Sequence, residues 1–324
     1  MGILKKLTEE YFGEIEREED FIDIYGLDVE IVSFTDNNGK FHKRGYKPKD
    51  KDTLEKLLKR MIEVRGDKGN FNDIDTSDIT SMKFLFNYNS TFNGNITGWN
   101  VSKVIDMSHM FAYATSFNQP IGNWEFPKVE NMSGMFSHAT SFNQDISKWK
   151  FPKVIYMNCM FWDATSFNQP IGDWEFLKVE NMSGMFYGAA SFNQDISKWK
   201  FPKVIYMNCM FWDATSFNQP IGDWEFLKVE NMSGMFSGAT SFNQDISKWK
   251  FPKVEDMSTM FYGASSFNQP IGNWEFPNVE NMNRMFSNAT SFNQDLSKWD
   301  LKGKKKDEIF DGCPIKDEYK PKMK

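Results

Sequence analysis

The 27-residue stretch WKFPKVIYMNCMFWDATSFNQPIGDWE occurs twice in this chain, as residues 149–175 and again as residues 199–225, with no difference between the copies. The tryptophan that opens each copy belongs to a longer series. Tryptophan recurs at a strict 25-residue step, at Trp99, Trp124, Trp149, Trp174, Trp199, Trp224, Trp249, Trp274 and Trp299. An uninterrupted period of this length is typical of a solenoid, in which each coil buries its apolar face against its neighbours.

One coil has the apolar spacing of a leucine-rich repeat, at Ile146, Trp149, Phe151 and Val154. Trp149 and Phe151 alternate with lysines, which predicts a short strand with both rings inside. Apolar residues then follow at steps of three and four as far as Ala164, which predicts a short helical stretch. The expected fold is therefore an α/β solenoid, a leucine-rich-repeat-like array of 25-residue coils that each contain a strand and a helical turn.

Solenoids need caps that cover their terminal coils. Residues 52–65 have amphipathic helical spacing, with Asp52 and Glu55 as a capping box and Gly66 as the stop. Upstream, the segments DVEIVSF and KFHKRGY flank TDNNG, which predicts a hairpin. We therefore divide the chain into an N-terminal cap of hairpin and helix (1–66), a solenoid of about nine to ten repeats (67–313) and a charged C-terminal tail (314–324).

An asparagine of the SFNQ motif recurs in every coil. One interpretation is a row of ligand-binding amides. The other is a structural ladder, in which each side chain satisfies backbone groups at the turn and in the next coil. We favour the ladder, because a solenoid turn otherwise leaves polar groups unpaired. Its expected members are Asn93, Asn118, Asn143, Asn168, Asn193, Asn218, Asn243, Asn268 and Asn293.

The residues on either side of each tryptophan alternate in charge from coil to coil. Lys148 and Lys150 flank one tryptophan, whereas Asp173 and Glu175 flank the next. Opposite charges on neighbouring strands stabilise by about 0.2–1 kcal/mol per pair, so this alternation explains a unit of two coils and sets the register. The same pairing argues against Asp173 and Glu175 as catalytic carboxylates.

The chain has three cysteines and three histidines, none at metal-ligand spacing. Cys159 and Cys209 lie two coils apart, which is about 10 Å and beyond the reach of a disulfide. Cys313 takes the place of a small residue in the repeat, and we expect all three cysteines to be small buried hydrophobes. No nucleophile–base pair or phosphate loop is present either, so we predict a non-enzymatic protein with no catalytic residue, metal or cofactor.

Charge and hydropathy exclude further classes of function. The net charge is −6 and the isoelectric point is about 5.3, which argues against binding to nucleic acid or to an acidic membrane. No stretch approaches 18 consecutive apolar residues, and the N-terminal residues lack a signal-peptide core. The sequence by itself therefore predicts a cytoplasmic protein that does not insert into membranes.

Several aromatic residues fall outside the core columns, on or near the helical side of the coils. If they are exposed, they suit contact with a protein or a glycan. The alternative is that they pack between coils. The candidate partner-binding residues are Trp162, Trp212, Tyr113, Tyr187 and Tyr262.

The coil sequence NMSGMFSGATSFNQDISKW (231–249) resembles the repeat of BspA-like leucine-rich-repeat surface proteins, with its M-x-x-M-F-x-x-A-x-x-F-N-x-x-I-x-x-W pattern. The match runs from about Phe71 to Cys313, and the flanks YKPKDKDTLEKLLKRM and CPIKDEYKPK also look like those of such arrays. The resemblance implies a bacterial, often surface-exposed protein of a family associated with adhesion to host or neighbouring cells. It implies no binding residues, because the family pattern consists of core positions.

Two functions remain as hypotheses. In the first, the solenoid binds another macromolecule, a protein or a glycan, as an adhesion-type module of a bacterial surface. In the second, the chain is an intracellular structural or scaffold protein whose N-terminal 50 residues carry the specificity; the lack of a recognisable export signal favours this hypothesis.

Overall fold

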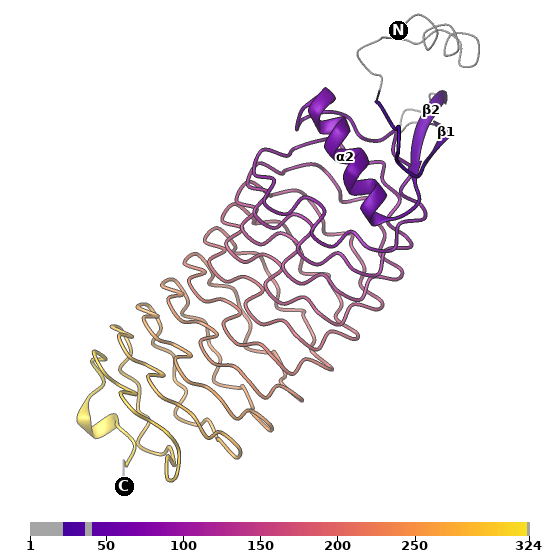
Figure 1. The fold of residues 1–324 in the computed structure, drawn as a ribbon. Helices are drawn as coiled ribbons and strands as arrows, with labels where there is room; N and C mark the ends of the chain where they lie inside the picture. The colour runs from indigo at the N-terminus through magenta and orange to yellow at the C-terminus, as the bar shows by residue number, and fades with distance from the viewer. Residues whose placement is uncertain (1–21, 36–40, 323–324) are drawn as a thin grey trace, which may run out of the picture.

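The computed structural model describes residues 22–35 and 41–322. It is a long rod of stacked coils with a cap at its N-terminal end (Figure 1). The expected TDNNG turn, and the part of the cap that precedes residue 22, lie outside the described residues. Within the described part, no helix has both the length and the apolar character needed to cross a bilayer.

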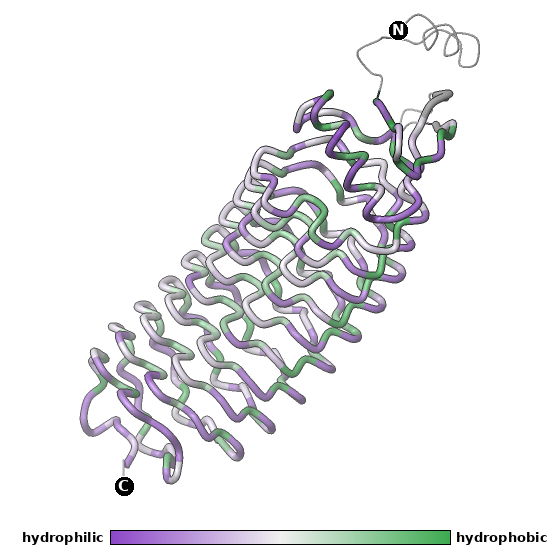
Figure 2. The backbone as a smooth tube through the Cα atoms, viewed as in Figure 1, coloured by the Kyte–Doolittle hydropathy of each residue, from purple (hydrophilic) through white to green (hydrophobic). Residues whose placement is uncertain are grey.

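The coils follow one another at the 25-residue step of the tryptophan series. Parallel single-residue bridges join each coil to the next, from Ser81 to Asp106 and onward as far as Asn281 and Lys305. Apolar and polar residues line up from coil to coil in continuous columns along the rod (Figure 2). The solenoid expected from the sequence is confirmed.

The prediction of a helical turn in each coil is wrong. In the segment 159–164, successive backbone N–H groups alternate between two kinds of partner. The N–H of Phe161 donates to the carbonyl of Met185 in the next coil at 2.9 Å, whereas the N–H of Trp162 turns back to Cys159 at 3.1 Å. A run of tight turns results, and it meets the same three- and four-residue apolar spacing as a helix while bonding the coils together.

The expected strand at Trp149 and Phe151 is also absent, although both rings are buried and the flanking lysines are exposed as predicted. The N–H of Trp149 turns back to the carbonyl of Ile146 at 3.1 Å. Pro152 follows Phe151 and has no N–H to donate. The N–H of Trp149 is used within its own turn and Pro152 has none. Trp149 and Pro152 therefore donate no hydrogen bond to a neighbouring coil, and no strand ladder forms at this point.

The core of the rod is a set of aromatic stacks that run along its axis. Phe136 stacks on Phe142 of its own turn at 3.9 Å between ring centroids and on Phe161 of the next coil at 5.7 Å. The indole N–H of Trp149 donates to the carbonyl of Ile121 in the preceding coil at 3.2 Å, and most other core tryptophans repeat this bond. Each coil thus satisfies the polar atoms of its neighbour while it buries that neighbour's rings.

The N-terminal cap consists of two strands and a helix. Strands β1 (Val29–Thr35) and β2 (Phe41–Pro48) form an antiparallel pair, and helix α2 (Lys51–Arg65) lies across the first coil (Figure 1). Leu54, Leu57, Leu58 and Met61 of the helix are buried in the same core as the coils.

The boundaries of α2 differ at one end from the sequence-based prediction. Gly66 ends the helix as expected, with a positive φ of 72° that favours glycine and an N–H that donates to the carbonyl of Ile62 at 2.8 Å. At the other end the capping residue is Asp50, whose carboxylate accepts the N–H of Thr53 at 2.9 Å. Asp52 instead lies inside the first turn, where a negative charge is favoured by the helix dipole.

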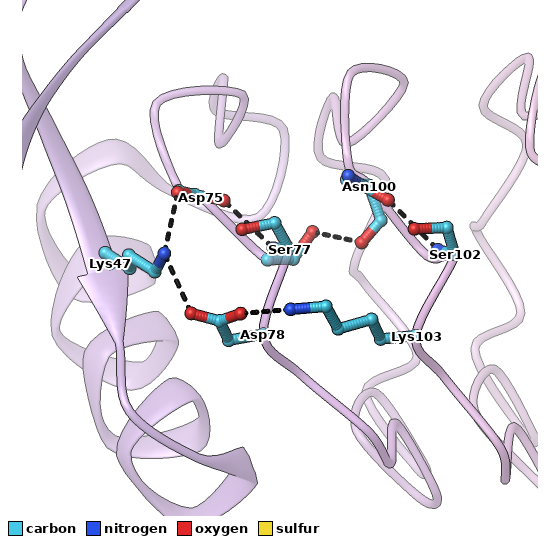
Figure 3. Close-up of polar contacts among 8 residues, drawn as sticks. Lys47, Asp75, Ser77, Asp78, Asn100, Ser102 and Lys103 are labelled. Atoms are coloured by element: carbon cyan, nitrogen blue, oxygen red, sulfur yellow. Dashed lines mark hydrogen bonds and ion pairs between the residues drawn. The ribbon is translucent and has the colours of Figure 1, made fainter.

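Ion pairs fasten β2 to the first two coils (Figure 3). Asp78 lies between two lysines: Lys47 of β2 at 2.8 Å and Lys103 of the following coil at 2.6 Å. Lys47 also reaches Asp75 at 3.6 Å. Hydrogen bonds from Lys103 and then Lys47 lower the pKa of Asp78 to about 2.

This junction should weaken in acid. The pKa of Asp78 is below its unfolded value, so its stabilising effect is complete above about pH 4 and is lost as the pH falls toward 2. We expect Asp78→Asn to speed amide exchange at Tyr46 and Asp75, whose backbone bonds of 2.8 and 2.9 Å cross the junction. The difference from wild type should be complete at pH 6, much smaller at pH 2 and lost as the pH falls below 2. It should also shrink in 1 M salt; a difference that persists unchanged at pH 2 would contradict the assignment.

The C-terminal residues close the other end of the rod. A short 3-10 helix, η2 (Asp317–Tyr319), packs against the last coil, and the carbonyl of Tyr319 accepts the N–H of Leu296 at 2.8 Å. The N–H of Lys316 donates to the side chain of Asn293 at 3.0 Å, and Ile315 is buried. Residues 314–322, although highly charged, therefore form part of the folded structure.

Candidate binding surface

The asparagine column forms a ladder along the rod. The side-chain oxygen of Asn168 accepts the backbone N–H of Asn193 at 3.0 Å and the amide of Gln194 at 2.9 Å. The same pattern links the column from Asn93 to Asn293. These oxygens are occupied by the neighbouring coil, so the column is structural in character.

The charged residues that flank the core tryptophans form ion pairs between neighbouring coils at two places, as expected. Lys198 lies 3.0 Å from Asp173, and Lys248 lies 3.2 Å from Asp223. All four side chains are largely exposed, so each pair contributes at most about 1 kcal/mol. Asp173 therefore takes part in a solvated ion pair.

In each coil, the run of tight turns contains two residues with positive φ, four positions apart. In one coil they are Cys159 and Asp163, with φ of 58° and 51°. In the next they are Gly184 and Gly188. A Cβ atom at Gly188 would overlap the carboxylate of Asp163, so the glycine leaves the space in which the side chain of the preceding coil lies. This alternation is a second reason for a two-coil unit.

The two cysteines in this region differ from the prediction. Cys159 and Cys209 are half-buried rather than buried, because their column faces outward beside the glycines. Both are free thiols, and burial raises the pKa of each. Cys313 lies in the alanine column as expected, but it too is only half-buried. Raised pKa values leave these thiols protonated at neutral pH and make them poor nucleophiles.

A continuous row of rings follows the same side of the rod, and we call it the aromatic strip. Ring centroids of successive members are 4.2–6.0 Å apart. Three of the five successive pairs are stacked, whereas Trp162 is tilted by 32° and 37° against its two neighbours. The members are Tyr88, Tyr113, His138, Trp162, Tyr187 and Trp212.

The candidate aromatic residues were expected either to be exposed or to pack between coils, and the structure shows that several do both. Trp162, Tyr187 and Trp212 pack between coils and are also partly exposed. Tyr113 is 37% exposed. Tyr262 is equally exposed but lies apart from the strip, because the intervening coil has the buried Ser237 in the corresponding position.

Two carboxylates lie beside the rings of the strip. Asp163 is 3.4 Å from the Nδ1 atom of His138. Burial raises the pKa of Asp213, and the neighbouring charge of Asp163 adds to this effect. Burial, Asp213 and Asp163 together raise the pKa of Tyr187. A hydrogen bond from Trp212 acts in the opposite direction on the pKa of Asp213.

His138, Asp163 and Asp213 occupy variable positions of the repeat, which marks them in the sequence but does not place them in one row with the rings. The row changes column between His138 and Trp162, a step of 24 residues instead of 25, so the 25-residue alignment does not reveal it. A usable signal is the Trp-Asp pair that occurs in both identical coils. Across residues 22–35 and 41–322, no group of histidine, cysteine and acidic side chains has a geometry suited to a metal ion.

A comparison with protein-family models finds three overlapping matches to one family, described as Mycoplasma protein of unknown function, DUF285. The matches cover residues 54–174, 146–243 and 220–317, which together make up more than three quarters of the chain. The chain belongs to the DUF285 family. Neither the search of curated proteins nor the search of solved structures finds a match.

The DUF285 matches begin inside helix α2 and end at the start of η2, so they include most of the cap helix as well as the coils. Each match spans several coils. This agrees with a fold in which a single coil cannot bury its own face. The family is bacterial and of unknown function, so it assigns no role to the aromatic strip of this DUF285 protein.

Proposed function

We propose that this DUF285 protein is a non-enzymatic binding rod that captures another protein through the aromatic strip. The observation that carries the proposal is the strip itself, six partly exposed rings in one line along the rod. Tryptophan and tyrosine are the side chains that most often dominate protein–protein binding energy. Exposed aromatic rows of this kind are uncommon on surfaces without a partner.

The ring geometry favours a protein over a glycan. Tyr113 and His138 stack at 4.2 Å with an angle of 11° between their planes, and Tyr88 and Tyr113 stack in the same way at 4.5 Å. A sugar packs on the face of a ring, and in the stacked pairs the facing sides of the rings are already covered by each other. The outward edges can still pack against the side chains of a protein partner.

The resemblance of the coils to BspA-like repeats supports an adhesion-type role, in which the rod engages a protein of another cell. The contact is made by the coils in this proposal and not by the N-terminal cap. The cap lies at one end of the rod (Figure 1), whereas the strip runs along coils from Tyr88 to Trp212.

The proposal is tested with a double substitution that the repeat itself supplies. Serine occupies the column of Trp162 and Trp212 in other coils, so Trp162→Ser with Trp212→Ser should preserve the fold. Proline occupies the column of the exposed Leu177 and Leu227 in other coils, so Leu177→Pro with Leu227→Pro is a matched control away from the strip.

Linear peptides would be selected from a random displayed library on the immobilised wild-type protein. We expect the selected peptides to bind the leucine-to-proline variant as well as wild type and the tryptophan-to-serine variant about tenfold less tightly or worse, as for loss of interface aromatic anchors. Peptides that bind all three proteins equally, or a selection that yields no binders, would refute a role for the strip.

A further inference from the structure

Among the described residues, no lysine or arginine pairs with the two carboxylates of the aromatic strip. Asp163 has His138 as its only ion-pair partner within the described chain, and Asp213 has none. By contrast, Asp173 and Asp223, which occupy equivalent coils on another side, each pair with a lysine. Charge complementarity at the strip therefore points to a cation supplied from outside.

The two carboxylates are duplicates, because the 27-residue stretch that contains Asp163 is repeated identically around Asp213. Hydrogen-bonded coils repeat at about 4.8 Å, so positions two coils apart are separated by about 9.6 Å. Backbone hydrogen bonds join these coils one to the next, from the N–H of Asp163 to the carbonyl of Tyr187 at 2.7 Å and from the N–H of Gly188 to the carbonyl of Trp212 at 2.7 Å. The two carboxylates therefore lie two hydrogen-bonded coils apart along the rod.

Only some peptide conformations match this spacing. A polyproline II helix rises about 3.1 Å per residue and returns to the same face every three residues, at about 9.3 Å. A β-strand returns to one face at about 6.7 Å and again at about 13.4 Å, which brackets the required distance without meeting it. Aromatic-lined surfaces are the established recognition mode for polyproline II segments.

We propose that the aromatic strip binds an extended, polyproline II segment of another protein that carries arginine at every third position. Two successive arginines pair with Asp163 and Asp213, and the residues between them pack on Trp162, Tyr187 and Trp212. This inference rests on the proposed function and names the chemistry of the partner.

Arginine fits the site better than lysine. Its planar guanidinium can form two parallel hydrogen bonds with a carboxylate, and its aliphatic stem can lie along ring edges. Trp212 lies over Gly234 of the next coil, and its indole N–H donates to the carboxylate of Asp213. An arginine that pairs with this carboxylate therefore lies beside the indole.

The test uses three labelled peptides of defined sequence and measures binding by fluorescence anisotropy. The first is a proline-rich peptide with arginine at every third position. The second has the same composition with its arginines contiguous, and the third is an alanine-rich helical peptide with arginines seven residues apart, since a helix rises about 10.5 Å over seven residues.

Two variants with the same change in net charge separate a specific site from general attraction. Asp163→Asn with Asp213→Asn removes the strip carboxylates, and asparagine occurs naturally in this left-handed column at Asn288. Asp173→Asn with Asp223→Asn removes the matched carboxylates elsewhere. We expect the first pair to weaken the every-third-arginine peptide about tenfold or more and the second pair about twofold or less, as for loss of two charge-assisted bonds.

The proposal is overturned if the two variants weaken binding equally, if the contiguous or helical peptide binds as tightly, or if the first peptide does not bind. The library selection distinguishes this failure from failure of the proposed function. Selected peptides that depend on Trp162 and Trp212 but lack basic residues would leave the strip as a protein-binding surface and refute only the arginine proposal.

Discussion

Replacing Trp199 with alanine is expected to lower the free energy of unfolding by about 3–5 kcal/mol, the usual cost of removing a large buried aromatic side chain. Trp199 has no exposed surface and lies in a central coil. Its ring meets Phe176 edge to face at 4.7 Å and stacks on Trp224 at 6.4 Å. Its indole N–H donates to the carbonyl of Ile171 at 3.0 Å, and the substitution removes this bond and leaves that carbonyl with the backbone N–H of Trp174 at 3.1 Å.

Because Trp199 lies in a central coil, its substitution should also affect how cooperatively the rod unfolds. In a solenoid each coil is held only by its two neighbours, so a weakened central coil can let the two halves of the rod unfold separately. Urea unfolding followed by circular dichroism measures the shift in midpoint, and hydrogen exchange locates the weakened coils. Trp212→Ser is the control, since this partly exposed residue should cost no more than about 1 kcal/mol. An equal loss in the two variants would contradict the assignment of Trp199 to the core.

The second large effect is expected for Gly222→Ala. A Cβ atom at this position would lie 2.5 Å from the backbone oxygen of Asp245 in the next coil. A backbone oxygen cannot rotate away as a side chain can, so the coils must separate locally. We expect a loss of about 3 kcal/mol in the free energy of unfolding, at the upper end of the cost of overpacking.

Gly263→Asn provides the matched control for Gly222→Ala. Gly263 has open space where a Cβ would be added, and its φ of 62° is in a region that asparagine tolerates. The equivalent position in the following coil is Asn288. The variant should unfold within about 0.5 kcal/mol of wild type in urea, as for a surface substitution. If Gly222→Ala were equally neutral, the close approach of the two backbones could not be a constraint on the repeat.

The sequence by itself determined the parts of the fold that depend on periodicity. Residues that recur at one step must occupy equivalent places, so the tryptophan series predicts the solenoid and the SFNQ motif predicts the asparagine ladder. The cap helix and hairpin were also predictable, because amphipathic spacing and turn residues act over short distances. The capping residue was misplaced by two positions, since Asp50 and Asp52 both precede an apolar run.

The secondary structure of the coil was decided only by the tertiary structure. Apolar steps of three and four suit a helix and a run of turns equally well. The choice depends on where the backbone N–H groups of residues such as Phe161 find acceptors, and half of them find these acceptors in the next coil. A neighbouring coil is therefore part of the local conformation, and no window of sequence contains it.

The sequence predicts one part of the candidate binding surface, and only the tertiary structure reveals the other. Sequence selects Trp162 and Trp212 because they depart from the core pattern, and identical repeats place them two coils apart. Only the folded rod brings His138 into the same row as Trp162, and only the glycine at 188 shows where the carboxylate of Asp163 lies. The physical reason is that contacts between coils depend on the stacking of side chains from adjacent columns, which a 25-residue alignment keeps separate.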